Sequence, residues 1–249
     1  MLHDAHFHLH TQALAQLIKE QAIQGIVNIQ NKKEYELVKQ CFPHLNQHDI
    51  YFSAGIHPWH ADANTWQEME PIMSEAMFIG EIGLDCVWSD QPLEKQREVF
   101  ICSLAYAHVH HKPVILHIKG MEYEVLTHIQ RYSNHYLVHW YSCDQYIKEY
   151  QNLDCYFTIG PSVLKDPAVQ QVARMIPLNR LLVESDGLEA LSWCENKAIP
   201  LSEYPSYLQR TIKEIAAIKC LDERFVANQL AQTFADWLCK AMHSDTLNK

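Results

Sequence analysis

Short runs of apolar residues recur along the chain, separated by longer stretches in which apolar positions follow a helical spacing. Runs of this length, bounded by polar residues, are typical of buried strands. They cover residues 1–9, 25–29, 51–56, 78–82, 114–118, 136–140, 155–159 and 181–185. Eight such strands, each followed by a segment long enough for a helix, predict an α/β fold: a TIM-type (β/α)8 barrel of parallel strands.

The intervening stretches support this alternation of strands and helices. Apolar residues at helical spacing predict faces that pack on the barrel, as in the C-terminal group Phe225, Val226, Leu230, Phe234, Trp237 and Leu238. Pro92 and Pro113 border one long stretch, and proline suits a helix border. Residues 188–202 are expected to form the longest irregular connection. No repeat or linker divides the chain, so we expect one domain over residues 1–249.

Composition restricts the class of protein further. The 249 residues are 48% hydrophobic, enough for one large core. No apolar run is long enough to span a membrane and no export signal begins the chain, so the sequence predicts a cytoplasmic protein without membrane contact. Nothing in it indicates an obligate protein partner. The eight cysteines form no C-x-x-C pair of the kind found in zinc knuckles or redox couples.

Charge and histidine content point toward a compact metal site. The formal net charge of −10 argues against a broad surface for duplex DNA, because such binding neutralises many phosphates. The chain has 16 histidines, and neutral imidazole is a common ligand for transition metals. The question is therefore which histidines converge.

The first predicted strand carries two of them. Residues alternate sides along a strand, so Asp4, His6 and His8 are expected on one side and Ala5 and Phe7 on the other. In a parallel barrel that side is the interior, whose C-terminal end is where barrel enzymes place their chemistry. His6 and His8 can therefore share one metal ion.

Four further polar residues each end an apolar run, namely Glu81, His117, His139 and Asp186. A polar group in a buried strand costs a few kcal/mol unless it is paired, and a shared metal would supply the partner. Four neutral histidines and two carboxylates suit two divalent ions that keep positions open for water and substrate.

Each residue alone has an ordinary structural explanation. A single strand histidine is more often a hydrogen-bonded core residue. Asp186 and Glu184 could be turn or capping residues, and Glu81 could pair with a lysine. The metal interpretation rests on the joint placement of six ligand-type residues at strand ends.

These residues also carry a resemblance. The chain resembles the TatD-type metal-dependent deoxyribonucleases, within the amidohydrolase-like barrels, through the motifs DAHFHL at 4–9, GIHPW at 55–59, IGEIGLD at 79–85, QREVF at 96–100, PVILH at 113–117 and LVESD at 182–186. The resemblance implies that Glu81 bridges two metals. It implies that His6, His8 and Asp186 complete one site, and that His117 and His139 complete the other.

Some positions depart from the family pattern. Trp140, Tyr141 and Cys143 stand where the family usually has cysteine, phenylalanine and glycine, and Lys119 stands where arginine is common. Gly187-Leu188-Glu189 replaces a small residue, proline and an aromatic, and Ala235 stands where asparagine is common. These departures affect expected substrate contacts and leave the six ligands in place.

The expected reaction is metal-dependent hydrolysis of a phosphodiester bond. A water bridging two ions (Mg, Mn or Zn) would attack phosphorus, with Asp186 as proton acceptor and Glu81 holding the metals, both as catalytic residues. Lys119 and His57 are the predicted substrate-binding residues, although Lys119 could equally be a solvated loop lysine. A nucleobase could stack on an aromatic neighbour, with Trp59, Trp140 and Tyr141 as candidates.

The leading functional hypothesis is a deoxyribonuclease that removes nucleotides from a strand end, as a 3'-5' exonuclease does, with DNA or a small phosphoester as substrate. A second hypothesis keeps the metals and changes the reaction to hydrolysis of an ester, lactone or amide, because fold analogy does not decide the substrate. A third is a metal-binding interaction protein without catalysis, which the presence of all six ligands disfavours.

Overall fold

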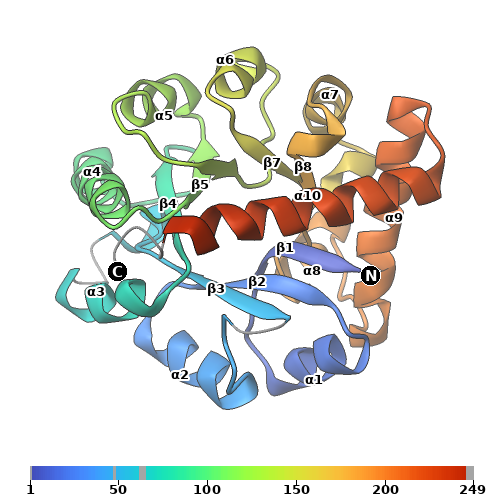
Figure 1. Cartoon of the computed structure of the whole chain (residues 1–249), viewed down its shortest axis with the longest axis horizontal. Helices are drawn as coiled ribbons and strands as arrows, with labels where there is room; N and C mark the ends of the chain where they lie inside the picture. The colour runs from blue at the N-terminus through green and yellow to red at the C-terminus, as the bar shows by residue number, and fades with distance from the viewer. Residues whose placement is uncertain (1, 47–48, 62–65, 245–249) are drawn as a thin grey trace.

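Eight parallel strands form a barrel in the computed structural model, which describes residues 2–46, 49–61 and 66–244 (Figure 1). The strands pair in chain order from β1 to β8. Their bounds are β1 His3–His8, β2 Gln24–Ile29, β3 Ile50–Ala54, β4 Phe78–Asp85, β5 Val114–Lys119, β6 Tyr136–Val138, β7 Tyr156–Ile159 and β8 Leu181–Val183. The predicted barrel and all eight predicted strand positions are therefore confirmed.

Helices surround this barrel. They are α1 Gln12–Glu20, α2 Lys32–Cys41, α3 Trp66–Glu75, α4 Leu93–Val109, α5 Glu122–Ile129, α6 Ile147–Asn152, α7 Pro167–Met175, α8 Leu188–Glu195, α9 Tyr204–Lys219 and α10 Glu223–Ser244. Short 3-10 turns, η1 Pro58–His60, η2 Pro161–Leu164, η3 Leu178–Arg180 and η4 Leu201–Glu203, lie in the connections.

The expectation of an irregular connection at 188–202 was wrong. Its first half is the helix α8, in which Leu191 and Cys194 are buried. Leucines at 188 and 191 have helical spacing, and the first proline after them is Pro200, so nothing in the sequence interrupts a helix there. This helix carries side chains that border the functional site described below.

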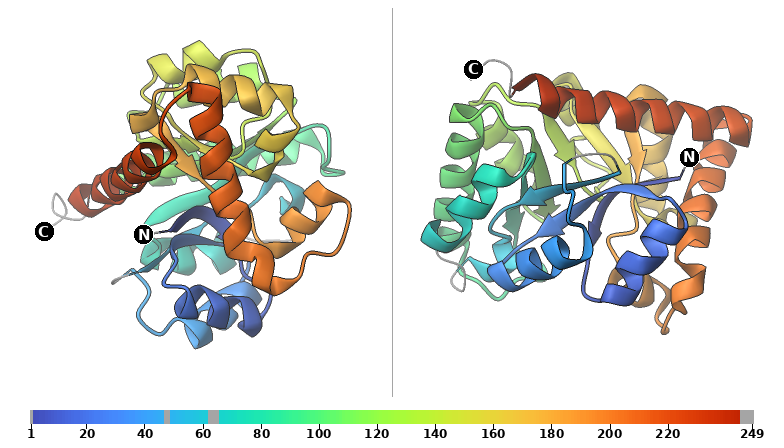
Figure 2. Two further views of the ribbon diagram at one scale, coloured as in Figure 1. Left: turned by 90° about the vertical axis from the view of Figure 1, so that its right-hand side faces the viewer. Right: turned by 60° about the horizontal axis from the view of Figure 1, so that its bottom comes forward.

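Helix α10 covers the end of the barrel at which the strands begin (Figures 1 and 2). Its Trp237 is fully buried, with ring centres 5.5 Å from Phe78 and 5.1 Å from Tyr156. Phe78 is the first residue of β4 and Tyr156 the first of β7. Since α10 covers this end, the opposite end, where the strands finish, is the end available for a site.

A carboxylate joins β1 to the segment after β8. Asp4 Oδ1 accepts a hydrogen bond from the Ser185 amide at 3.0 Å, and Asp4 Oδ2 accepts from the hydroxyls of Ser185 and Tyr204, both at 2.6 Å. The Asp186 amide donates to the His6 carbonyl at 3.1 Å. These bonds tie the last strand of the barrel to the first.

The expected grouping of Asp4 with His6 and His8 was therefore wrong. The pairing of β1 with β2 shifts register between Asp4 and Phe7, as in a β-bulge. An extra residue in one strand breaks the simple alternation of side chains. Asp4 consequently reaches α9, while His6 and His8 approach Glu81 on β4.

Replacing Tyr204 with phenylalanine should reduce the stability of the fold. The change removes the hydroxyl that donates to the fully buried Asp4 carboxylate. Loss of a partner from a buried polar group costs about 1 to 3 kcal/mol. Urea unfolding followed by circular dichroism should show this decrease, whereas an unchanged midpoint would mean that the network contributes little.

Candidate metal centre

The six predicted ligands and His57 converge at the open end of the barrel. His6 and His8 come from β1, Glu81 from β4 and His117 from β5. The remaining two follow strand ends: His139 comes directly after β6, and Asp186 lies just beyond β8. Two residues differ from expectation, since Glu81 and His117 stand inside their strands and not at the ends. Both strands continue further because residues 82–85 of β4 keep pairing with residues 116–119 of β5.

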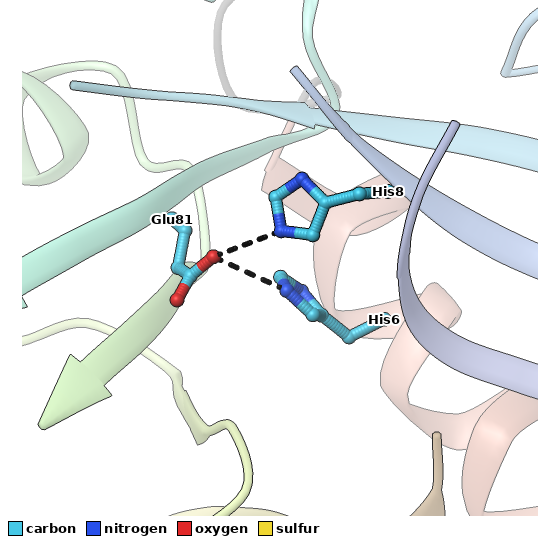
Figure 3. A group of neighbouring side chains, drawn as sticks. All are labelled: His6, His8 and Glu81. Atoms are coloured by element: carbon cyan, nitrogen blue, oxygen red, sulfur yellow. Dashed lines mark hydrogen bonds and ion pairs between the residues drawn. The ribbon is translucent and has the colours of Figure 1, made fainter. Parts of the chain in front are cut away.

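Glu81 lies between two groups of imidazoles. Its Oε2 is 3.3 Å from Nε2 of His6 and 3.3 Å from Nε2 of His8 (Figure 3). Its Oε1 is 2.7 Å from Nδ1 of His117 and 3.1 Å from Nε2 of His139. The Glu81 side chain is buried, with 2% of its surface exposed. Its two oxygens face two different groups of imidazoles, so one carboxylate can serve two neighbouring sites.

His57 joins the second group. Its Nε2 lies 3.2 Å from Glu81 Oε1 and 3.2 Å from His117 Nδ1. Three residues beyond β3, its backbone precedes the turn η1, and its Nδ1 accepts a hydrogen bond from the Trp59 amide. The structure thus places His57 among the candidate ligands, and its predicted contact with substrate stays a prediction.

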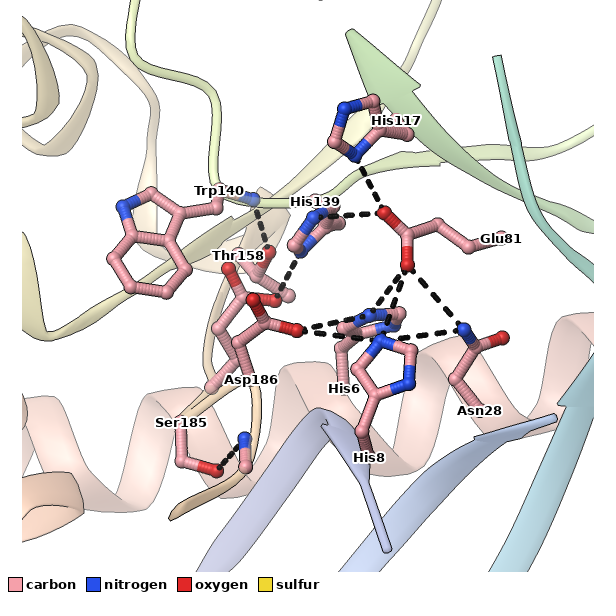
Figure 4. A network of polar contacts seen from close by, with 12 residues as sticks. His6, His8, Asn28, Glu81, His117, His139, Trp140, Thr158, Ser185 and Asp186 are labelled. Carbon is pink, nitrogen blue, oxygen red and sulfur yellow. Dashed lines mark hydrogen bonds and ion pairs between the residues drawn. The ribbon is translucent and has the colours of Figure 1, made fainter. Parts of the chain in front are cut away.

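Asp186 stands beside the first group. Its Oδ1 is 3.5 Å from Nε2 of both His6 and His8 (Figure 4). Its φ of 61° is unusual for a residue other than glycine, although aspartate and asparagine adopt this region more readily than most. Gly187 follows with φ of 91°, and a Cβ there would lie 2.8 Å from the His8 carbonyl oxygen. Glycine at 187 therefore lets the Asp186 turn approach β1.

Further polar residues, which the sequence interpretation did not assign to the site, orient the imidazoles. His117 Nε2 is 3.0 Å from Asp85 Oδ2, and His139 Nδ1 is 3.2 Å from Glu184 Oε2. Asn28 Nδ2 lies 3.3 Å from Glu81 Oε2. A carboxylate on the far nitrogen of a ligating histidine fixes its orientation and raises its basicity. Asp85 could have been suspected from its place in IGEIGLD, whereas Asn28 gave no signal in the sequence.

Charges in this cluster are strongly coupled. Burial alone would raise the pKa of Glu81, but the nearby imidazoles of His139 and His57 hold it well below its usual value. Burial would lower the pKa of His139, yet Glu81 and Glu184 raise it well above its usual value. For His57 burial prevails and lowers the pKa to about 4. The protein thus holds an ionised, buried carboxylate among imidazoles.

The donor set fits divalent cations. Ligand atoms lie within 4.8 Å of one another in three groups: His6 with His8 and Glu81, His6 with His139 and Asp186, and His57 with Glu81 and His117. His6 Nε2 and Asp186 Oδ1, which lie 3.5 Å apart, are buried without a hydrogen bond. Unpartnered buried polar atoms are costly, and a cation bound among them would remove that cost. Imidazole and carboxylate together suit zinc, manganese and related ions.

A cavity of about 800 Å³ opens above this cluster. Lys119 lines it, with Nζ donating to Ser142 Oγ at 2.7 Å and lying 4.5 Å from the centre of the Trp88 ring. Trp59 and Trp140 also line the cavity. Tyr141 does not serve as a stacking surface, because it is 1% exposed and packs against Tyr150 in the core.

Of the helices described, none has the length and apolarity needed to cross a membrane.

Known proteins share this fold and sequence pattern. The family model described as TatD related DNase matches residues 3–238. The metal-dependent hydrolase YabD of Bacillus subtilis is 26% identical, over 75% of this chain and 80% of its own. The 3'-5' ssDNA/RNA exonuclease TatD of Rahnella sp. is 24% identical, over 71% of this chain and 72% of its own.

Among solved structures, the TatD homologue YjjV of Escherichia coli superposes with a TM-score of 0.77 at 19% sequence identity. The match covers 93% of this chain and 95% of that one. At this identity the likeness concerns the fold, and it agrees with the eight-stranded barrel described above.

Proposed function

The chain belongs to the TatD-related DNase family of metal-dependent hydrolases, and from this premise we propose that it hydrolyses phosphodiester bonds in single-stranded nucleic acid. We propose that two divalent cations, of magnesium, manganese or zinc, bind at the cluster around Glu81. His6, His8 and Asp186 would hold one, and His117 and His139 would hold the other.

One observation carries this proposal: the two oxygens of Glu81 face different sets of imidazoles. A carboxylate so placed can bind two cations at once and hold them close together. Paired cations only a few ångströms apart are the arrangement used by many phosphatases and nucleases. An alternative in which Glu81 merely balances one protonated histidine would not explain why four imidazoles lie within 3.3 Å of its two oxygens.

When bound, the cations would lower the pKa of a water and neutralise charge on the phosphoryl oxygens. Asp186, beside His6 and His8, would orient the attacking water and accept its proton. Lys119 would meet a phosphate oxygen from the cavity wall, since its single described hydrogen bond to Ser142 leaves further N–H groups to donate. Asp85 and Glu184 would keep His117 and His139 in position.

The charges that line the cavity favour the end of a single nucleic-acid strand as substrate over duplex DNA. Among the described residues that line it, Lys119 is the one lysine or arginine, whereas Glu34, Asp166 and Glu189 are acidic. Binding to duplex DNA depends on neutralising many phosphates. A single positive side chain next to paired cations suits one or two phosphates. The Rahnella relative, named a single-strand exonuclease, supports the same class of substrate.

A comparison of substrates tests the proposal. The purified protein with added Mg²⁺, Mn²⁺ or Zn²⁺ should release nucleotides from single-stranded DNA much faster than from a blunt duplex. Turnover of carboxyl esters, lactones or amides without any nucleotide release would instead identify an amidohydrolase-type reaction. Tight cation binding with no turnover of either kind would indicate a non-catalytic metal protein.

A further inference from the structure

Two tryptophans border the cavity above the metal centre and are unusually exposed. Trp88 is 48% exposed and Trp193 is 67% exposed, and both line the cavity. Their rings contact each other edge to face, with centres 5.7 Å apart and planes at 72°. Large aromatic surfaces left open beside a binding cavity are more informative than isolated exposed apolar residues, because they mark places where a ligand would cover them.

The same segments that build the metal centre position these rings. Trp88 follows β4, and its amide donates to Asp85 Oδ1 at 2.8 Å, the carboxylate that also contacts His117. Trp193 belongs to α8, the helix that begins two residues after Asp186. The pair therefore brings the segment after Glu81 into contact with the segment after Asp186 on the lining of the cavity.

Lys119, the proposed contact for a substrate phosphate, lies next to one ring of this pair. Its ammonium lies 4.5 Å from the centre of the Trp88 ring, a cation–π contact, and 2.7 Å from Ser142 Oγ. A positive group next to an aromatic platform is the combination that proteins use for single strands, with charge for the backbone and a ring for the base. Glu34, Asp166 and Glu189 also line the cavity, and their negative charges would repel the phosphates of a longer strand.

We propose that Trp193, held edge to face by Trp88, is the stacking surface for the nucleobase next to the bond that is cleaved. Lys119 contacts the phosphate of the same nucleotide. The inference rests on the proposed hydrolysis of single-stranded nucleic acid and names the part of the substrate that gives it affinity. Because every base presents a π-face, this subsite accepts all four bases and requires that a base be present and unpaired.

The test compares strands with and without a terminal base. Single-stranded oligonucleotides would end either in a normal nucleotide or in an abasic residue, and initial rates would be measured with the metal-loaded protein. Stacking on an aromatic side chain is worth about 1 to 3 kcal/mol per base. Trp193→Ala should therefore raise KM for the normal strand about tenfold with little change in kcat, and should leave KM for the abasic strand unchanged.

Two variants control the measurement. Trp193→Phe keeps an aromatic face and should retain most of the affinity for the normal strand. Phe225→Ala removes another aromatic side chain, which is 50% exposed and belongs to α10, the helix at the closed end of the barrel. This variant should change KM for neither strand. Equal effects of Trp193→Ala on the normal and abasic strands, or no effect on either, would overturn the proposal.

A binding measurement separates this inference from the proposed function. Calorimetric titration with deoxyadenosine monophosphate and with 2-deoxyribose 5-phosphate should show about tenfold tighter binding of the nucleotide. Trp193→Ala should remove that difference. If this difference appears while no strand is hydrolysed, the stacking subsite is supported and the proposed reaction is wrong. If strands are hydrolysed and wild type binds both compounds equally, the reaction stands and the stacking subsite is wrong.

Discussion

Glu81→Gln should lower the hydrolysis of single-stranded DNA by at least about a thousandfold, or about 4 kcal/mol at 1.36 kcal/mol per factor of ten. Glutamine has the shape of glutamate but lacks its charge and offers one carbonyl oxygen in place of two carboxylate oxygens. Because Glu81 Oε2 faces His6 and His8 while Oε1 faces His117 and His139, a single substitution affects both cation positions. Rates at saturating metal and elemental analysis of the protein would measure the loss of activity and of bound metal.

A matched control separates this effect from loss of charge in general. Glu70→Gln makes the same change at an exposed position on α3, outside the residues that line the cavity, and should leave both measurements unchanged. Glu81→Gln that keeps full activity and two equivalents of metal would remove Glu81 from its bridging role.

Asp186→Asn should lower kcat by about a hundred- to ten-thousandfold, the usual contribution of a general base. Asparagine keeps the size of the side chain but does not accept a proton at neutral pH. It also tolerates the backbone at φ of 61°, and the hydrogen bond that the residue 186 amide donates to the His6 carbonyl does not depend on the side chain. The expected result is therefore a protein with strongly reduced kcat and nearly wild-type stability, measured by single-turnover kinetics and thermal unfolding.

The two substitutions are expected to differ in metal content. Asp186 Oδ1 lies 3.5 Å from Nε2 of both His6 and His8, and Asp186 groups with His139 but not with His57 or His117, so Asp186→Asn should retain the cation held on the His117 side of Glu81. Glu81→Gln should weaken the binding of both cations. An active Asp186→Asn protein would show that another group accepts the proton.

Much of the barrel could be predicted from the sequence because each strand is a short apolar run bounded by polar residues. The polar residues that end those runs identified the candidate ligands, since a buried polar side chain needs a partner wherever it lies. His117 and His139 illustrate this well. Each has an ordinary explanation alone, and only their shared position at one end of a barrel makes a shared metal ion the better interpretation.

The errors have a different physical origin. Asp4 was placed beside His6 because strict alternation was assumed, whereas the bulge in β1 depends on how β2 pairs with it. The contact between Trp88 and Trp193 has no signal in the sequence, because it depends on how two segments far apart in the chain fold over the cavity. Local sequence carries little information about such register shifts and contacts between loops.

Cation dependence of nucleotide release from single-stranded DNA tests the central claim most directly. Protein treated with a chelator and then dialysed should release no nucleotide. Activity should return on addition of Mg²⁺, Mn²⁺ or Zn²⁺ and reach its maximum when about two ions are bound per chain, in line with paired-cation hydrolysis. Nucleotide release that persists at the same rate in metal-free protein would contradict the account.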